Sequence, residues 1–506
     1  MDRIPVSSKQ PVSPAQVAAP LLGGAGTRFA RADRRGATSI AWALMGLFGL
    51  SVLVGLLLQV PCQTGGYELP RAGFRLCQSP VALAMGSDAL PDAAGRVTSG
   101  LAGFAPLTYW FVILMSSLGA TAGEAMGFLL VLNTAAFAAM GVGVLALARA
   151  LGFGAPRSRA VSLSWAMVAF VSPVIVFSIG QSLDPVGVAL AVWACVLLSG
   201  ARTTPTLLSA GAMLAVAAFT GPLGLIVLVG VLIGASRDRG NAILVLAGFA
   251  LASGLLTLAD GRLPSRLSVW MADAVDRGSI ASVVLAQGWG DEPTFVTGLL
   301  VVWTLGVVAI TAMAASRMML APTAAAEVAD TDADNATAED LSSSTSSRLD
   351  LLRRLEKTDD VAHLQQTVLT ITALLALSVV VAPGSSTSMS LWLLPFAALS
   401  VRLLPVMGLW FLTELGFAIA VPLADVTALD ESAGLDSTWM GLLTLLRFFA
   451  LTLIMAFALD ELFRAGRKRV ARRQEAARAM ELNPAPGQAG AETAPDQAPE
   501  ESSGTA

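Results

Sequence analysis

The stretch Ser39–Gln59 reads SIAWALMGLFGLSVLVGLLLQ and contains no charged side chain. About 20 apolar residues are enough to cross the hydrocarbon core of a bilayer as a helix, which satisfies its own backbone hydrogen bonds there. Similar runs recur along the 506-residue chain, which is 55% hydrophobic and only 13% charged. Ordinary soluble domains do not reach these values. The sequence therefore predicts an all-α polytopic membrane protein.

The apolar runs predict about twelve transmembrane helices. An additional interfacial or re-entrant helix is expected over 103–118, after the first extracytoplasmic loop. Gly221 and Pro222 interrupt the apolar run 205–235, which we interpret as a short hairpin. The predicted spans are 39–59, 126–148, 160–180, 185–200, 205–219, 222–235, 242–258, 295–315, 366–382, 390–404, 406–423 and 438–459.

The distribution of basic residues predicts the orientation in the membrane. With the amino terminus inside, most of the 32 Lys and Arg residues fall in or beside cytoplasmic segments, as the positive-inside rule expects. The run Arg464 to Arg473 has six basic residues and no acidic one, which suits an anionic inner leaflet. We therefore predict a multi-pass plasma-membrane protein that contacts membrane lipids, has both termini in the cytoplasm and binds no nucleic acid.

Composition divides the chain into five parts. We expect a basic cytoplasmic segment, two membrane blocks separated by an acidic disordered linker, and a tail that is first basic and then disordered. The only histidine, His363, falls at the end of the linker and is expected to be solvated. The five parts are 1–38, 39–320 with extracytoplasmic loops 61–102 and 259–293, 321–365, 366–462 and 463–506.

The cysteines predict one disulfide. Cys62 and Cys77 both lie in loop 61–102, on the oxidising side of the membrane. Cys195 falls within a predicted span and is interpreted as a small buried apolar residue. Two isolated cysteines without an external histidine do not make a zinc site, so we expect neither a metal nor a cofactor.

Glu414 and Arg447 are charged residues that fall inside predicted spans. Each would cost about 2.5 to 3.5 kcal/mol there unless it is paired or faces water. We expect the two to pair. Either the pair is structural and holds two helices together, or it lines a lipid or substrate cavity.

Further polar residues lie in the predicted outer loops. Asp184, in the turn SLDP, is expected either to cap the following helix or to face an outer cavity. Arg266 and Arg277 belong to loop 259–293. Arginine suits bidentate phosphate contacts, although an interfacial helix of mixed charge is often only a solvated surface.

Three stretches of sequence together resemble a known family. They are LCQSPVALAMGSDALPD followed by FAPLTYW, then WMADAVDRGSIASVV, and then SLWLLPFAALSVRLLPVMGLWFLTELGFAI. They are similar to the actinobacterial branch of the polyprenyl-phosphate-sugar-dependent glycosyltransferases of family 87, in the GT-C superfamily. The resemblance extends from about Ala37 to Leu462. It implies a GT-C-like fold and transfer of a mannose-like hexose or a pentose from a polyprenyl-phosphate donor to a cell-envelope glycan or lipid on the outer face.

The resemblance carries over to particular positions. Cys77 matches the loop cysteine of the family, Asp184 an aspartate in an NWDLLAV-like turn, and Glu414 the late-helix glutamate. The segment Pro106 to Trp110 is a shortened YPVLTGYW-like stretch, and Gly278 with Ser279 matches a GS pair.

The chain also departs from the family pattern. The presumed catalytic aspartate falls on Pro80, which cannot act as a base. A family lysine falls on Phe219, within AAFTGP, and an SPQY-like stretch has become SSTSMS over 385–390. These losses leave enzymatic activity open.

Asp88 or Asp92 is the replacement base that the first loop offers, with Arg266 and Arg277 near the donor phosphate. Ordinary loop aspartates are the competing interpretation. The leading hypothesis is therefore a hexosyltransferase-like enzyme. The alternative is a catalytically inactive relative that binds a lipid-linked sugar or acts as a scaffold for an envelope-synthesis protein partner. A transporter or flippase is a third hypothesis, which the lack of an internal sequence repeat disfavours.

Overall fold

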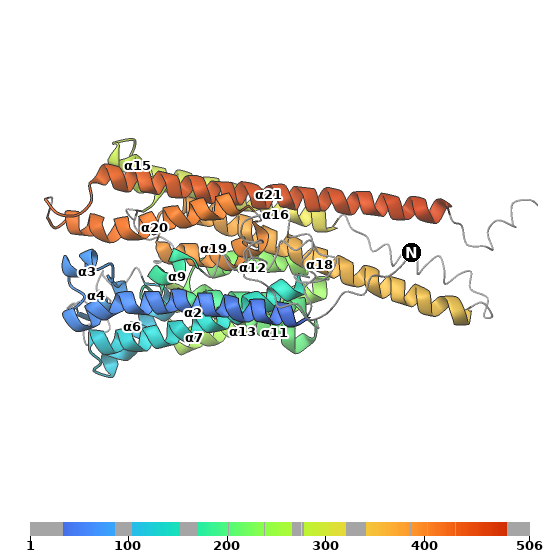
Figure 1. Ribbon diagram of the computed structural model, residues 1–506, viewed down its shortest axis with the longest axis horizontal. Helices are drawn as coiled ribbons and strands as arrows, with labels where there is room; N and C mark the ends of the chain where they lie inside the picture. Colours follow the sequence, from blue (N-terminus) through green and yellow to red (C-terminus); the bar gives the residue numbers. More distant parts are fainter. Residues whose placement is uncertain are drawn as a thin grey trace, which may run out of the picture.

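The computed structural model describes residues 34–86, 104–151, 171–200, 202–236, 238–265, 275, 278–319, 341–384, 386–401, 403–430 and 432–482. Within these ranges the protein is 83% helical and has no strand. The predicted all-α class is confirmed. Figure 1 shows long helices that run side by side along one axis.

The described residues form a succession of helices. In chain order they are α2 (Arg34–Gly65), α3 (Arg71–Phe74), α4 (Pro80–Gly86), α6 (Pro106–Ser117), α7 (Ala122–Ala150), α9 (Pro173–Ser178), α10 (Asp184–Ser199), α11 (Thr204–Thr220), α12 (Leu223–Ala235), α13 (Arg239–Ala259), α15 (Ile280–Ala286), α16 (Glu292–Met319), α18 (Leu341–Val381), α19 (Thr387–Ser400), α20 (Leu404–Thr427) and α21 (Ser437–Leu482).

Among the described residues, seven helices are long and apolar enough to cross a membrane: α2, α7, α13, α16, α18, α20 and α21. A multi-pass membrane protein is thereby supported, whereas the count of about twelve crossings stays a prediction. Four predicted spans form shorter apolar helices, namely α10, α11, α12 and α19, and the stretch 103–118 forms the short helix α6. The predicted span 160–180 lies mostly outside the described residues.

The described parts of loops 61–102 and 259–293 lie at one end of the bundle. Figure 1 shows α3, α4, α15 and the connection between α20 and α21 at this end, which we call the loop end. The amino-terminal end of α2 and the carboxyl-terminal end of α21 lie at the opposite end, which we call the tail end. Alternating helix directions produce this separation.

Helix α18 forms the centre of the bundle. In its apolar window 83% of the residues are buried, and it packs against α12, α16, α19 and α21. By contrast, only 6% of the residues are buried in the window of α16 and 11% in that of α13. These two helices present apolar side chains outward, as expected for surfaces in contact with lipid.

The carboxyl-terminal part of the predicted linker is helical in the structure. Helix α18 begins at Leu341, so the stretch 341–365 is helical. The helix contains neither proline nor glycine, and it continues without a break into the bundle. His363 is therefore carried inside and is 3% exposed, which shows that the expectation of a solvated histidine was wrong. The predicted unstructured tail from Asn483 lies outside the described residues.

Candidate functional site

The first loop is pinned by the predicted disulfide between Cys62 and Cys77. Helix α2 extends beyond the predicted span and places Cys62 in its last turn. Both cysteines are fully buried, and Arg75 Nη1 donates a hydrogen bond of 2.9 Å to Pro61 O. Residues 62–86, at the beginning of the predicted loop, thus form a compact helical unit at the loop end, which we call the cap.

This cap is docked onto the turn between α9 and α10, residues 178–183. Ser79 Oγ donates a 2.6 Å hydrogen bond to Gly180 O. Gln181 Nε2 donates to Gln78 O over 3.1 Å. Because the two bonds come from neighbouring residues of the cap, they hold its orientation as well as its position.

A second attachment joins the cap to α20. Gln78 Nε2 donates a 3.1 Å hydrogen bond to Asp425 Oδ2. At Gly73, a Cβ atom would lie 2.5 Å from Val426 Cγ2 and 2.9 Å from Pro422 O, so only glycine allows this approach. The cap therefore connects α20 with the turn that leads into α10.

Side chains from two other helices satisfy the backbone of the α9–α10 turn. Asn133 Nδ2, on α7, donates to Ile179 O at 2.7 Å and to Ser182 O at 2.9 Å. Thr108 Oγ1, on α6, accepts from Leu183 N at 3.3 Å. Irregular backbone within a membrane protein requires such partners because lipid supplies none.

Asp184 begins α10 and is 8% exposed. Its Oδ2 accepts a 2.6 Å hydrogen bond from Ser182 Oγ, and its Oδ1 accepts a 3.0 Å bond from Trp392 Nε1 on α19. The predicted helix cap is not observed, because no side chain caps α10. The tertiary donors bind the carboxylate instead, so Asp184 links α10 to α19.

A glycine makes room for this contact. At Gly221, a Cβ atom would lie 2.5 Å from Asp184 Oδ1 and 2.7 Å from the Trp392 ring. Gly221 belongs to the stretch AAFTGP, which also contains Phe219. Phe219 is 6% exposed and extends the apolar core.

Serines at the start of α19 contact the guanidinium group of Arg447. Ser388 Oγ lies 2.8 Å from Ser386 Oγ. Arg447 Nη2, on α21, donates to Ser386 O at 3.1 Å and to Ser390 Oγ at 2.8 Å. Ser386 and Ser390 thus bind Arg447, and Ser388 bonds to Ser386.

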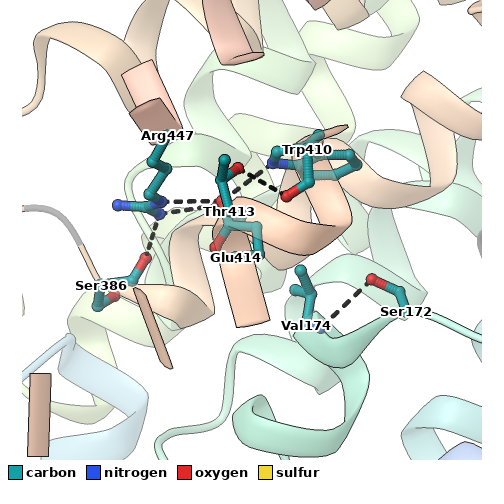
Figure 2. A network of polar contacts seen from close by, with 8 residues as sticks. Ser172, Val174, Ser386, Trp410, Thr413, Glu414 and Arg447 are labelled. Atoms are coloured by element: carbon teal, nitrogen blue, oxygen red, sulfur yellow. Dashed lines mark hydrogen bonds and ion pairs between the residues drawn. The ribbon is translucent and has the colours of Figure 1, made fainter. Parts of the chain in front are cut away.

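Glu414 and Arg447 form the predicted ion pair, with 2.8 Å between Arg447 Nε and Glu414 Oε1. Figure 2 shows Trp410 and Arg447 converging on this carboxylate, with Ser386 on the other side of the guanidinium. The same oxygen accepts from Ser390 Oγ at 2.6 Å and from Trp410 Nε1 at 2.9 Å. Glu414 Oε2 is buried and has no partner.

Both members of the pair are shielded from solvent, at 0% exposure for Arg447 and 1% for Glu414. The guanidinium carbon also lies 4.1 Å from the centre of the Phe417 ring, a favourable cation–π geometry. Since the pair ties α21 to α19 and α20, the structural interpretation is favoured over a cavity lining.

The structure does not describe four of the predicted site residues. Asp88, Asp92, Arg266 and Arg277 lie outside the described residues. Pro80 is exposed and starts α4, where its missing N–H is tolerated. Within the described part of the chain, no group of three His, Cys, Asp or Glu residues is arranged to hold a metal ion.

Sequence reasoning missed the polar contacts of Asn133, Thr108 and Trp392. Asn133 offered a signal, because a single amide in a long apolar helix must find a partner. Trp392 offered no such signal.

Comparisons of the chain with protein-family models, curated proteins and solved structures found no match. The resemblance to family 87 stays a prediction.

Proposed function

We propose that this protein is a GT-C-type membrane glycosyltransferase with about twelve crossings. It would transfer a mannose-like hexose or a pentose from a polyprenyl-phosphate donor to an envelope glycan or lipid at the loop end. One observation carries the proposal. Two of the three stretches that resemble family 87 bind Asp184 or the turn that leads into it.

These contacts join segments that are far apart in sequence. The cap that carries Cys77 binds the turn before Asp184, and Thr108 of FAPLTYW binds the same turn. Trp392 of the SLWLLP stretch binds Asp184 itself. A chance resemblance would not need its motifs to meet in one place, so their convergence supports a common site.

The expected chemistry needs a base and cations near the outer membrane surface. A carboxylate takes the proton of the acceptor hydroxyl as it attacks the anomeric carbon, while cations stabilise the departing phosphate. Asp88 or Asp92 follows the pinned cap by a few residues. Arg266 and Arg277 follow Asp260, whose Oδ2 accepts a 3.0 Å bond from Trp110 Nε1 beside the cap.

The test uses the purified full chain and a radiolabelled polyprenyl-phosphate sugar. Replacing Asp88 and Asp92 together by Asn is expected to reduce transfer by about 10² to 10⁴. The matched control is Asp430→Asn, an exposed aspartate in another loop at the same end, which is expected to leave the rate unchanged. Transfer that survives the double replacement would contradict the assigned base.

A catalytically inactive relative is the second candidate, and Pro80 favours it. The position of the expected base is occupied by a residue that serves as the first residue of a helix. Such a protein would bind the lipid-linked sugar, or a protein partner in envelope synthesis, without turnover. Saturable binding of the labelled donor with no transfer by the unsubstituted chain would support this function and reject the enzyme.

A further inference from the structure

Within the part of the chain that the structure describes, the α9–α10 turn is surrounded by buried hydrogen-bonding atoms without a partner. They are Gln59 Oε1, Gln78 Oε1, Asn133 Oδ1 and Ser178 Oγ. Gln78 and Asn133 are bonded to the turn through other atoms, and Ser178 belongs to it. The amide of Gln59 packs against Gly180, where a Cβ atom would lie 2.9 Å from its Nε2.

The orientation of two of these amides is set by their own bonds. Asn133 uses Nδ2 to donate to two backbone carbonyls, and Gln78 uses Nε2 to donate to a carboxylate. Exchanging oxygen and nitrogen would place an oxygen against an acceptor in each case. Asn133 Oδ1 and Gln78 Oε1 are therefore acceptor oxygens, and they need donors.

Leaving such groups empty would be costly. A buried acceptor without a donor lowers the stability of the folded state by about 1 to 3 kcal/mol. Nearly all buried polar groups in proteins bond to protein or ordered water. Asn133 and Ser178 are 0% exposed and Gln59 is 3% exposed, so bulk solvent does not reach them. Four such atoms around one turn indicate a bound donor.

The chemistry of the atoms favours a neutral donor over a cation. Amide oxygens carry no net charge, and a buried cation requires compensation by an anion. The carboxylate closest in the bonding network, Asp425, already accepts from Gln78. A hydroxyl group or a water molecule can donate to these oxygens without such compensation.

We propose that the α9–α10 turn is a binding site for hydroxyl groups, supplied by ordered water or by a carbohydrate. The site borders the disulfide-pinned cap and leads to Asp184, because Ser182 Oγ donates to Asp184 Oδ2. It goes beyond the proposed function, since it requires no glycosyl transfer.

The first test measures access to the turn in the full chain, with Cys195 replaced by Ser. Ser178→Cys is exposed to a charged, membrane-impermeant thiol reagent. The matched control is Ser378→Cys, a buried serine whose hydroxyl donates to Leu374 O and accepts from Trp303 Nε1. Ser178→Cys is expected to react several-fold faster than the control.

Methyl α-mannoside distinguishes the two sources of hydroxyl groups. Slower modification of Ser178→Cys in its presence would assign the site to a carbohydrate. Fast modification that the sugar does not change would assign it to water. If Ser178→Cys reacts no faster than Ser378→Cys, the proposed site does not exist.

A second measurement needs no substitution. In hydroxyl-radical footprinting, bound water promotes oxidation of nearby side chains. Met126 Sδ lies 3.2 Å from Ser79 Oγ, which bonds to the turn, whereas Met140 lies farther along the same helix. Both are buried, at 0% and 2% exposure. Met126 is expected to oxidise several-fold faster, and equal rates would reject the site. This readout is independent of sugar transfer, so the two proposals fail separately.

Discussion

Glu414 and Arg447 show how individual residues carry charge inside this bundle. The carboxylate receives three hydrogen bonds on one oxygen, and both side chains are excluded from solvent. We expect Arg447→Met to destabilise the protein by about 3 to 5 kcal/mol, because it leaves a buried carboxylate without its cation. Equilibrium unfolding in detergent measures the loss.

The double variant Glu414→Leu with Arg447→Met provides the companion test. It is expected to recover much of the stability, since no unpaired charge remains. The control is Arg464→Ala on the same helix, whose ion pair with Asp460 is exposed and contributes less than about 1 kcal/mol. An Arg447→Met variant as stable as Arg464→Ala would show that the pair does not hold the helices.

Two uses compete for the side chain of Asp184, a local helix cap and hydrogen bonds to other donors. Its position at the start of α10 suits a local cap, yet its oxygens bond to Ser182 and Trp392. The indole N–H, buried with the carboxylate, has to be satisfied as well. The residue therefore connects elements that are 208 positions apart.

At the scale of elements, the disulfide connects the end of α2 to the start of α4. The two cysteines are 15 positions apart, and closing a loop of that length stabilises a protein by about 3 kcal/mol. We expect a reductant to lower the melting temperature of the protein. Cys195→Ser is expected to keep this sensitivity, and Cys77→Ser to abolish it. A melting temperature that reductant leaves unchanged would contradict the prediction.

We expect Asp436, at the start of α21, to contribute to the stability of the protein in a way that depends on pH. Hydrogen bonds from the Thr438 hydroxyl and then from its backbone N–H lower the pKa of the Asp436 carboxyl group. A lowered folded-state pKa contributes stability above the unfolded pKa of about 3.9, which is lost as the pH falls through the folded value.

Asp436→Ala is therefore expected to lower the melting temperature at neutral pH. The difference from the unsubstituted protein should shrink as the pH falls below about 3.9. Asp291→Ala, which removes a similar bond at the start of α16, is the matched comparison. A difference that stays constant with pH would show that the charge of Asp436 does not matter.

The loop end and the tail end lie at opposite ends of the whole molecule. Residues at the two ends are therefore expected to be labelled from opposite sides of the membrane. Gln287 is exposed at the loop end and Arg239 is exposed at the start of α13. With Cys195 replaced by Ser, we expect Gln287→Cys to react with an impermeant maleimide in intact cells, and Arg239→Cys to react only after permeabilisation. The positive-inside rule is the physical reason. The reverse pattern would invert the assigned orientation.

The sequence by itself determined the all-helical membrane class, the disulfide and the pairing of Glu414 with Arg447. Each follows from a requirement that can be recognised in a single segment of the sequence. An apolar run needs lipid, a charge within such a run needs a partner, and two cysteines on the oxidising side readily pair. These requirements hold whichever helices become neighbours.

Only the tertiary structure decided the partners of Asp184, the docking of the cap on α20, and the helical start of α18 at Leu341. The short helices α10, α11, α12 and α19 pack among others, so their apolar composition alone does not locate them. The physical reason is that hydrogen bonds between distant segments depend on which helices pack together. Burial cost is a property of each segment, whereas the choice of partner belongs to the whole bundle.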